Sequence, residues 1–217
     1  MNIVGALLSA AAFGFVITGM QALAHGEASV FGFGLTGLGL AAGVLLVRHE
    51  RPSRTPLIPL DLLARPMFAL SVATSIISFT AQMMAFVALP FFLQGSLGLN
   101  AVQTGLLMTP WPLATMFAAP LAGYLSDRYS AGVLGAIGLT LFACGLMALS
   151  LLNAESSHFD IVWRMAVCGA GFGFFQSPNN RAMLSEAPRE RAGAAGGSLG
   201  TARVLGHTMG AVVVAFL

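Results

Sequence analysis

The sequence predicts an all-α fold, a polytopic transmembrane helical bundle with about seven spans. Hydrophobic residues make up 57% of the 217 residues and charged residues only 8%, whereas a soluble domain carries about 25% charged residues. Seven long apolar segments follow one another along the chain, and a bilayer core needs about 20 apolar residues per helix. The chain contains no lysine, and eight of its ten arginines lie in every second loop between these segments.

The spans are expected near residues 3–24, 29–47, 67–93, 101–125, 131–152, 160–180 and 193–217. Short connections join them, except for the segment 48–66. Its prolines at positions 52, 56 and 59 break a helix, because proline lacks an N–H and clashes with the preceding turn. Two helices therefore precede this segment and five follow it. Further prolines predict kinks in or at the edge of the later spans: Pro90, Pro110, Pro112, Pro120 and Pro178.

The distribution of arginines predicts the orientation of the spans. Four arginines lie in the loop 48–66, one follows the fourth span and three follow the sixth, whereas the loops 25–28, 94–100 and 153–159 have none. Loops that carry an excess of Lys and Arg stay in the cytoplasm. We therefore expect a multi-pass protein of the inner or plasma membrane of the cell, with a cytoplasmic amino terminus and an outside carboxyl terminus.

The polar residues exclude several function classes. No nucleophile–base pair suggests catalysis, and no Cys/His spacing resembles a metal site, so we expect neither an enzyme nor a metal or cofactor. A formal net charge of +2 is too small to indicate a nucleic-acid partner. The lipid bilayer is the expected solvent for most of the surface.

A motif at the cytoplasmic end of the fourth span carries a family resemblance. Gly123 is followed four residues later by Asp127 and Arg128. A carboxylate in a tight turn between two helices can accept helix N-terminal N–H groups and interact with the helix dipole. It can therefore hold one packing arrangement and release it, so we expect Gly123, Asp127 and Arg128 to form a cytoplasmic gating motif. This segment resembles the cytoplasmic loop signature of the major facilitator superfamily.

Three further stretches are similar to the fourteen-helix drug/proton antiporters of that superfamily, the EmrB/QacA type. They are residues 59–65 (PLDLLAR), residues 89–110 with LPFFLQG and GLLMTP, and residues 171–206 with GFG, QSPNN, AR and LG. The resemblance implies a partial major facilitator fold. Residues 1–47 would be two linker transmembrane helices and 48–66 a cytoplasmic Pro/Arg-rich loop. Residues 67–217 would be the first five helices of the carboxyl-terminal bundle, with the last helix absent.

The same resemblance implies a function and a partner. The chain would be part of a transporter for proton-coupled efflux of drugs or other amphipathic compounds, with a hydrophobic or cationic substrate. The amino-terminal bundle, missing from the chain, would be its partner. Two alternatives stay open: a facilitator of a small metabolite, or a truncated chain that transports nothing and only packs against a partner half.

The polar residues inside the spans are the candidate substrate and proton pathway. No Asp or Glu lies in the middle of a span, so we expect the main proton-coupling carboxylates in the missing half. Arg203 lies deep in the last span, with His207 four residues later on the same helix face. They are either a substrate- or proton-linked pair, or an arginine that reaches the surface or backbone carbonyls. Four amides line the pathway or join helices: Gln82, Gln176, Asn179 and Asn180.

Overall fold

The computed structural model describes residues 3–24, 29–50 and 60–216. Residues 51–59 of the predicted Pro/Arg-rich loop 48–66, with Arg51 and Arg54, lie outside these residues. Every regular element in the described ranges is helical and none is a strand. The predicted all-α bundle is therefore confirmed.

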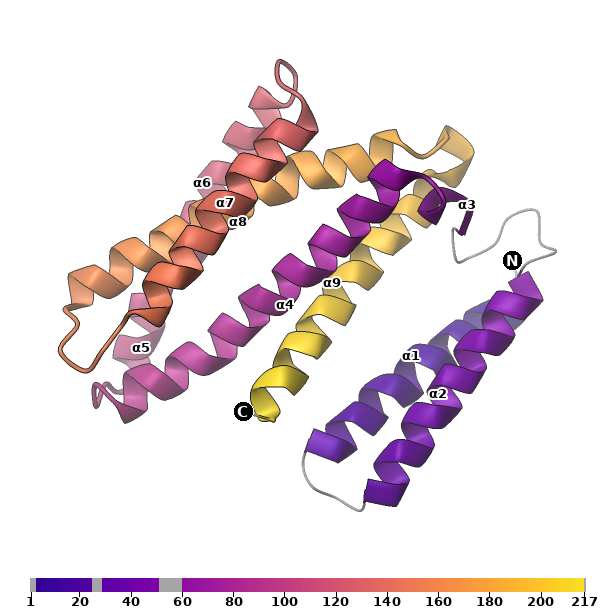
Figure 1. The fold of residues 1–217 in the computed structure, drawn as a ribbon, viewed down its shortest axis with the longest axis horizontal. Helices are drawn as coiled ribbons and strands as arrows, with labels where there is room; N and C mark the ends of the chain where they lie inside the picture. The colour runs from indigo at the N-terminus through magenta and orange to yellow at the C-terminus, as the bar shows by residue number, and fades with distance from the viewer. Residues whose placement is uncertain (1–2, 25–28, 51–59, 217) are drawn as a thin grey trace.

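The first two predicted spans form a hairpin of antiparallel helices. α1 (Ile3–Ala24) and α2 (Ser29–Glu50) lie side by side, apart from the main bundle (Figure 1). Their backbones approach closely: a Cβ added to Gly39 would lie 2.7 Å from the backbone nitrogen of Val16. Small residues allow this approach in a lipid environment, where packing rather than hydrophobicity holds helices together. α1 also contacts α9, the last helix of the main bundle.

The next elements are one turn of helix in the predicted loop 48–66, the third predicted span and the start of the fourth. α3 (Leu60–Leu63) is a single turn, and α4 (Pro66–Gly95) follows it and begins at a proline, whose missing N–H is not needed in the first helical turn. α5 (Ala101–Met108) starts with a capping box, in which the side chains of Asn100 and Gln103 each accept the other's backbone N–H at 2.9 and 3.1 Å.

The predicted fourth span, residues 101–125, is divided into two helices. α6 (Pro110–Leu125) begins immediately after α5, and the two meet at Thr109. Pro110 and Pro112 lack a backbone N–H, so two hydrogen bonds to the preceding turn are missing here. Thr109 keeps helical dihedrals (φ −57°, ψ −32°), so α6 continues from α5 after a local interruption at this residue.

The remaining helices begin at serine caps or at a short connection. α7 (Ala131–Ser150) follows Ser130, whose hydroxyl accepts the N–H of Val133 at 3.4 Å. α8 (His158–Ser185) follows Ser157, which caps the N–H of Asp160 at 3.2 Å. The 3-10 turn η1 (Arg189–Arg191) leads directly into α9 (Ala192–Ala215).

α8 is packed tightly between α6 and α7. A Cβ added to Gly173 of α8 would lie 2.9 Å from the carbonyl oxygen of Thr115 in α6. On the other side, a Cβ on Gly145 of α7 would lie 2.7 Å from the Cys168 sulfur of α8. Contacts of this kind fix the three helices against one another. Other glycines in the same interfaces would also meet a facing backbone: Gly138, Gly169 and Gly171.

The outer surface of the bundle is apolar, as expected for a protein in lipid. Large hydrophobic side chains such as Ile77, Phe91 and Phe117 are between 68% and 74% exposed. By length and composition, the candidate membrane spans among the described residues are Val30–His49, Pro66–Gly95 and Ala131–Ser150. α8 and α9 are long enough, but they contain more polar residues and glycines, and the fourth predicted span is divided.

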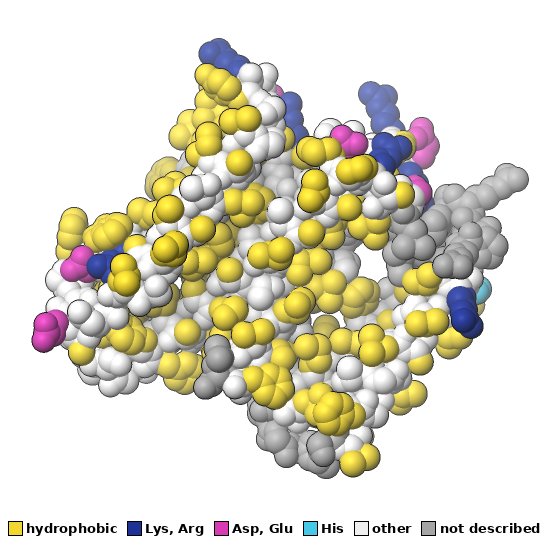
Figure 2. Space-filling view, in the orientation of Figure 1, with side chains coloured by type: hydrophobic (Ala, Val, Ile, Leu, Met, Phe, Trp, Pro, Cys, Tyr) yellow, Lys and Arg dark blue, Asp and Glu magenta, His cyan; other side chains and the backbone are white. Residues whose placement is uncertain are grey.

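Arginines gather at one edge of the molecule. The end of α2, α3, the α6–α7 turn and the α8–α9 connection all lie toward the upper and right side of Figure 1, while the α4–α5 and α7–α8 connections lie at the opposite side. Figure 2 shows most of the arginine side chains along this edge. We call it the arginine edge. Its described arginines are Arg48, Arg65, Arg128, Arg181, Arg189 and Arg191.

Candidate functional site

The first group of candidate residues lies at the turn between α6 and α7, on the arginine edge. The Asp127 carboxylate accepts a hydrogen bond from the Arg181 guanidinium of α8 at 2.6 Å, and both side chains are more than half exposed. The sequence suggested that Asp127 would accept N–H groups at a helix N-terminus. In the structure, Ser130 caps α7 and Asp127 joins the turn to α8 instead. The carboxylate therefore links two helix ends through an ion pair.

The other two motif residues support the same turn. Gly123 faces α8, and a Cβ at this position would lie 3.1 Å from the Ser177 hydroxyl. The Arg128 guanidinium lies 5.8 Å from the ring centre of Tyr124, one turn earlier in α6. Arg128 thus packs against its own helix, and Arg181 is the arginine that neutralises Asp127. No pattern in the local sequence indicated this second arginine, because it is 54 residues away along the chain.

A second set of contacts joins α3 to the α8–α9 connection. The Leu62 side chain is fully buried among Phe68 of α4, Met183 of α8 and Ala195 of α9. Asp61 forms an ion pair with Arg191 at 2.5 Å. We call this group, together with Arg65, the α3 clasp.

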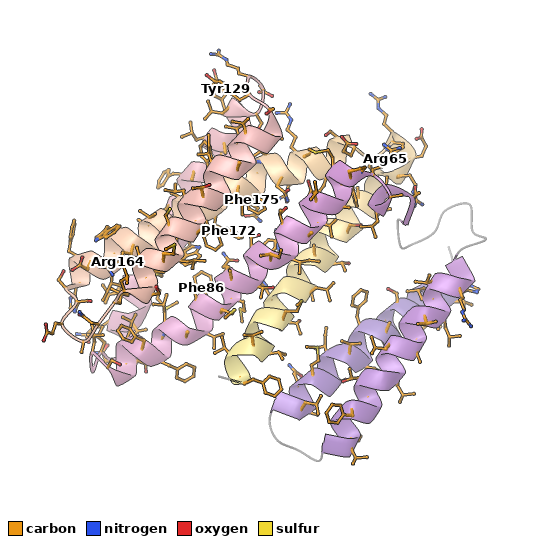
Figure 3. The ribbon with its side chains drawn as sticks, viewed as in Figure 1. Arg65, Phe86, Tyr129, Arg164, Phe172 and Phe175 are labelled. Carbon is orange, nitrogen blue, oxygen red and sulfur yellow. The ribbon has the colours of Figure 1, made fainter. Side chains whose placement is uncertain are left out.

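Arg65 completes the α3 clasp through the backbone. Its guanidinium donates to the carbonyl oxygen of Glu186, just after α8, at 2.6 Å. Figure 3 shows Arg65 at this end of the bundle, close to where α8 gives way to α9. The segment PLDLLAR therefore supplies an apolar anchor and two charged contacts, a role that sequence reasoning missed.

The amides predicted in the pathway differ in their surroundings. Asn179 is buried, and its side-chain nitrogen donates to the Ser75 hydroxyl at 2.8 Å and to the Ser71 carbonyl at 3.2 Å. These bonds join α8 to α4 and satisfy both N–H donors of the amide. Asn179 therefore acts as a link between helices. The side chains of Gln82, Gln176 and Asn180 are half-buried and form no hydrogen bond with the part of the chain that the structure describes.

Arg203 and His207 lie together beside a buried phenylalanine. The Arg203 guanidinium carbon lies 5.3 Å from the ring centre of Phe79 in α4, and the His207 ring meets the same phenylalanine edge-on at 5.2 Å. The predicted pairing on one helix face is thus found, with Phe79 as the shared contact. This phenylalanine was not among the predicted site residues, because its position opposite Arg203 depends on how α4 and α9 pack.

Phe79 is one end of a chain of aromatic contacts through the bundle. It meets Phe172 at 5.3 Å, which meets Phe142 at 5.5 Å, and Trp111 and Phe86 continue the series. Figure 3 shows Phe86 and Phe172 between α4 and α8. Arg203 and His207 therefore stand at the end of a continuous apolar core that joins α4, α6, α7 and α8.

Comparison with known proteins gives the family. The Major Facilitator Superfamily model matches residues 1–211. The chain is 50% identical over 212 residues to the uncharacterized transporter YebQ of Escherichia coli strain K12, covering 98% of this chain and 46% of that protein.

More distant similarities point the same way. The multidrug resistance protein Stp of Mycobacterium tuberculosis is 32% identical over 78% of this chain and 32% of its own length. The riboflavin transporter RibZ of Clostridioides difficile is 29% identical over 77% of this chain and 37% of its own length. The chain thus spans less than half the length of the curated relatives it matches. Its sequence, helical fold and similarities agree, and the chain belongs to the major facilitator superfamily.

Proposed function

We propose that this chain is the carboxyl-terminal portion of a longer exporter that moves amphipathic organic compounds out of the cell in exchange for protons. The observation that carries this proposal is the Arg203–His207 pair, which places polar donors at the midpoint of the 24-residue helix α9. Ionisable residues at this depth mark substrate or ion pathways in membrane proteins. Similarity to the multidrug resistance protein Stp supports an organic substrate.

The proposed arrangement follows the linker-containing antiporters. α1 and α2 would be the two linker helices, and α4 to α9 would form five spans of the carboxyl-terminal bundle. The α1–α2 hairpin packs mainly on itself and contacts the main bundle through α9, which supports this division (Figure 1). Transporters of this kind bind substrate between two bundles, so we expect the amino-terminal bundle to complete the site and to supply the proton-coupling carboxylates.

The proposed orientation places the arginine edge in the cytoplasm. It is supported by the gathering of arginines at one edge, because positively charged loops are retained inside. Reporters that are active on one side of the membrane, fused after residues 58 and 156, should report from opposite sides. The same side for both fusions would contradict the orientation.

Transport by two forms of the protein tests the proposed function. Cells that lack their own pumps would express either the full-length transporter or the 217-residue chain alone. The full-length protein should lower the accumulation of at least one of two amphipathic dyes, the cation ethidium and the anion fluorescein, in a manner abolished by a protonophore. The chain alone should behave as the empty vector, because alternating access needs two bundles around a shared site. Export by the chain alone, or no export of any tested drug by the full-length protein, would contradict the proposal.

A second function is favoured by one observation. The similarity to the riboflavin transporter RibZ makes transport of a small metabolite the alternative. Uptake of radiolabelled riboflavin by cells expressing the full-length protein separates the two functions. Riboflavin accumulation without any effect on either dye would favour the metabolite transporter.

A further inference from the structure

We propose that Arg203 forms a subsite for an amphipathic organic anion, with the guanidinium binding its carboxylate, sulfonate or phosphate group. This inference rests on the proposed transport function and names the substrate class. It departs from the cationic substrate expected from the sequence, for reasons of geometry and charge given below.

The side of α9 that carries Arg203 is left open by the neighbouring helices. Ala202 and Gly206 are buried where α9 packs on α4. Thr201 and Val204 line a cavity together with Phe13 of α1, so they face the α1–α2 hairpin. Because successive residues are separated by about 100° around a helix of 3.6 residues per turn, Arg203 and His207 lie on a third face. That face is turned toward Phe79 and the α8 side of α4, and Arg203 is exposed there.

The guanidinium of Arg203 is held in place without having its hydrogen-bonding groups satisfied. Phe79 positions it through a cation–π contact at 5.3 Å. No acceptor for its N–H groups occurs within residues 3–24, 29–50 and 60–216. Five other arginines each donate to an oxygen atom: Arg65, Arg128, Arg164, Arg181 and Arg191. Arg203 thus combines a position halfway along α9 with free donors.

The chemistry of a guanidinium selects the ligand class. Its planar fork of N–H donors matches two oxygens of a carboxylate or phosphate, and such charge-assisted bonds are stronger than neutral ones. An unpaired cation inside a membrane span is costly, so the binding of an anion that neutralises Arg203 is favoured.

The surrounding charges disfavour a cation at this position. α4, α5, α6, α7 and α9 contain no Asp or Glu, and the only acidic residue of α8 is Asp160 in its first turn. Asp160 is already bonded to Ser157 and to the Trp163 indole. A cationic drug would therefore meet Arg203 without a carboxylate from this bundle, whereas the apolar part of an organic anion could contact the aromatic residues near Phe79.

A pair of dyes with one ring system and opposite charges tests the inference. Fluorescein is anionic and rhodamine 123 is cationic, and both are built on a xanthene. Their equilibrium binding to the full-length transporter in nanodiscs can be followed by fluorescence polarisation. We expect fluorescein to bind about tenfold more tightly than rhodamine 123. Arg203→Gln should weaken fluorescein binding by roughly ten- to a hundredfold, as expected for lost hydrogen bonds to a charged group, and should leave rhodamine binding unchanged or tighter.

Two further variants keep the result interpretable. Arg189→Gln removes an exposed arginine from η1 and should change neither affinity, which controls for the loss of one positive charge. Arg203→Lys keeps the charge and loses the planar fork of N–H donors, so it should weaken fluorescein binding by a smaller factor than Arg203→Gln does. If Arg203→Gln does not fold, this variant decides by the same comparison of the two dyes.

The results that would overturn the inference are specific. Tighter binding of rhodamine 123 by the unmodified transporter would indicate that Arg203 is paired with a carboxylate of the other bundle. An equal loss of affinity for both dyes in Arg203→Gln or Arg203→Lys would assign Arg203 a structural role. Because these are binding measurements, they remain informative if export fails, and export itself tests the proposed function separately.

Discussion

The α3 clasp makes a quantitative prediction about the arginine edge. Leu62 is 0% exposed and contacts α4, α8 and α9, whereas its neighbour Leu63 is 37% exposed. Leu62→Ala removes the apolar anchor that holds α3 against the α8–α9 connection. We expect α3 to separate from this connection more often in the variant, while the rest of the bundle stays folded.

The size of the effect follows from the burial of Leu62. Replacing a fully buried leucine by alanine costs about 2–5 kcal/mol, depending on how far the site can collapse. The α3 clasp lies at an edge and can relax, so we take the lower limit of about 2 kcal/mol, which corresponds to roughly a 30-fold change in the local opening equilibrium. Asp61→Asn removes only the ion pair with Arg191; because the Asp61 carboxylate is more than half exposed, this pair contributes about 1 kcal/mol or less.

Limited digestion with trypsin measures this opening, because the chain has no lysine and is cut only after arginine. The Arg191 side chain is 13% exposed and held by Asp61, whereas Arg189 is exposed. Cleavage after Arg191 therefore requires the α3 clasp to open, and cleavage after Arg189 serves as an internal reference. In nanodiscs, Leu62→Ala should raise the initial rate of cleavage after Arg191 by about 30-fold when opening is fast relative to cleavage.

Leu63→Ala is the matched control, since it removes the same atoms from the exposed side of α3. It should change the rate by about twofold or less, as surface substitutions do. Equal rates for Leu62→Ala and Leu63→Ala would refute the reasoning, because the burial of Leu62 would then have no bearing on the arginine edge.

Two further predictions concern the Asp127–Arg181 ion pair and the packing of α9. In the full-length transporter, removing either charge of the Asp127–Arg181 pair should shift the balance between inward- and outward-facing states by up to about fivefold, the limit for an exposed pair. Exchanging the two charges in a double variant should restore this balance, which the accessibility of a reporter cysteine measures. A double variant no closer to the unmodified protein than the single variants would exclude the pairing. Gly206→Val should destabilise the protein by about 1–3 kcal/mol through overpacking, because a Cβ there would lie 2.6 Å from the Phe79 Cβ. Gly200→Val should not destabilise it, because no atom lies within 4 Å of a Cβ at that position. Unfolding in a denaturing detergent compares the two variants, and similar losses of stability would contradict the α4–α9 contact.

The spans could be predicted from sequence because the signal is local. An apolar stretch of sufficient length is visible without knowing its neighbours, and α1, α2 and α7 end within a few residues of the predicted limits. Arginine alternation likewise depends only on the order of the loops, and it correctly places the α6–α7 turn and the α8–α9 connection at one edge. The interruption between α5 and α6 was foreseen as a kink, because Pro110 and Pro112 act on their own turn.

The contacts between helices could not be predicted in the same way. Leu62 and Leu63 are adjacent and chemically identical, and only the packing of α3 on α8 and α9 decides which one is buried. The ion pair of Asp127 with Arg181 and the stacking of Arg203 on Phe79 depend on the rotation of one helix relative to another. A single sequence carries no direct record of these rotations, so the residues could be named as candidates but their partners could not.

The glycine contacts of α8 have a mechanical consequence for the helical bundle. Backbones in direct contact cannot slide past one another without steric overlap, so α6, α7 and α8 should move together as one rigid body. The interface between this rigid body and the α4–α9 pair is formed by side chains instead. The Phe79–Phe172 contact and the hydrogen bonds of Asn179 cross it. Side chains can change rotamer at little cost, whereas backbones cannot yield. Displacement within the bundle is therefore expected along this interface, and Arg203, which contacts Phe79 there, would move with it.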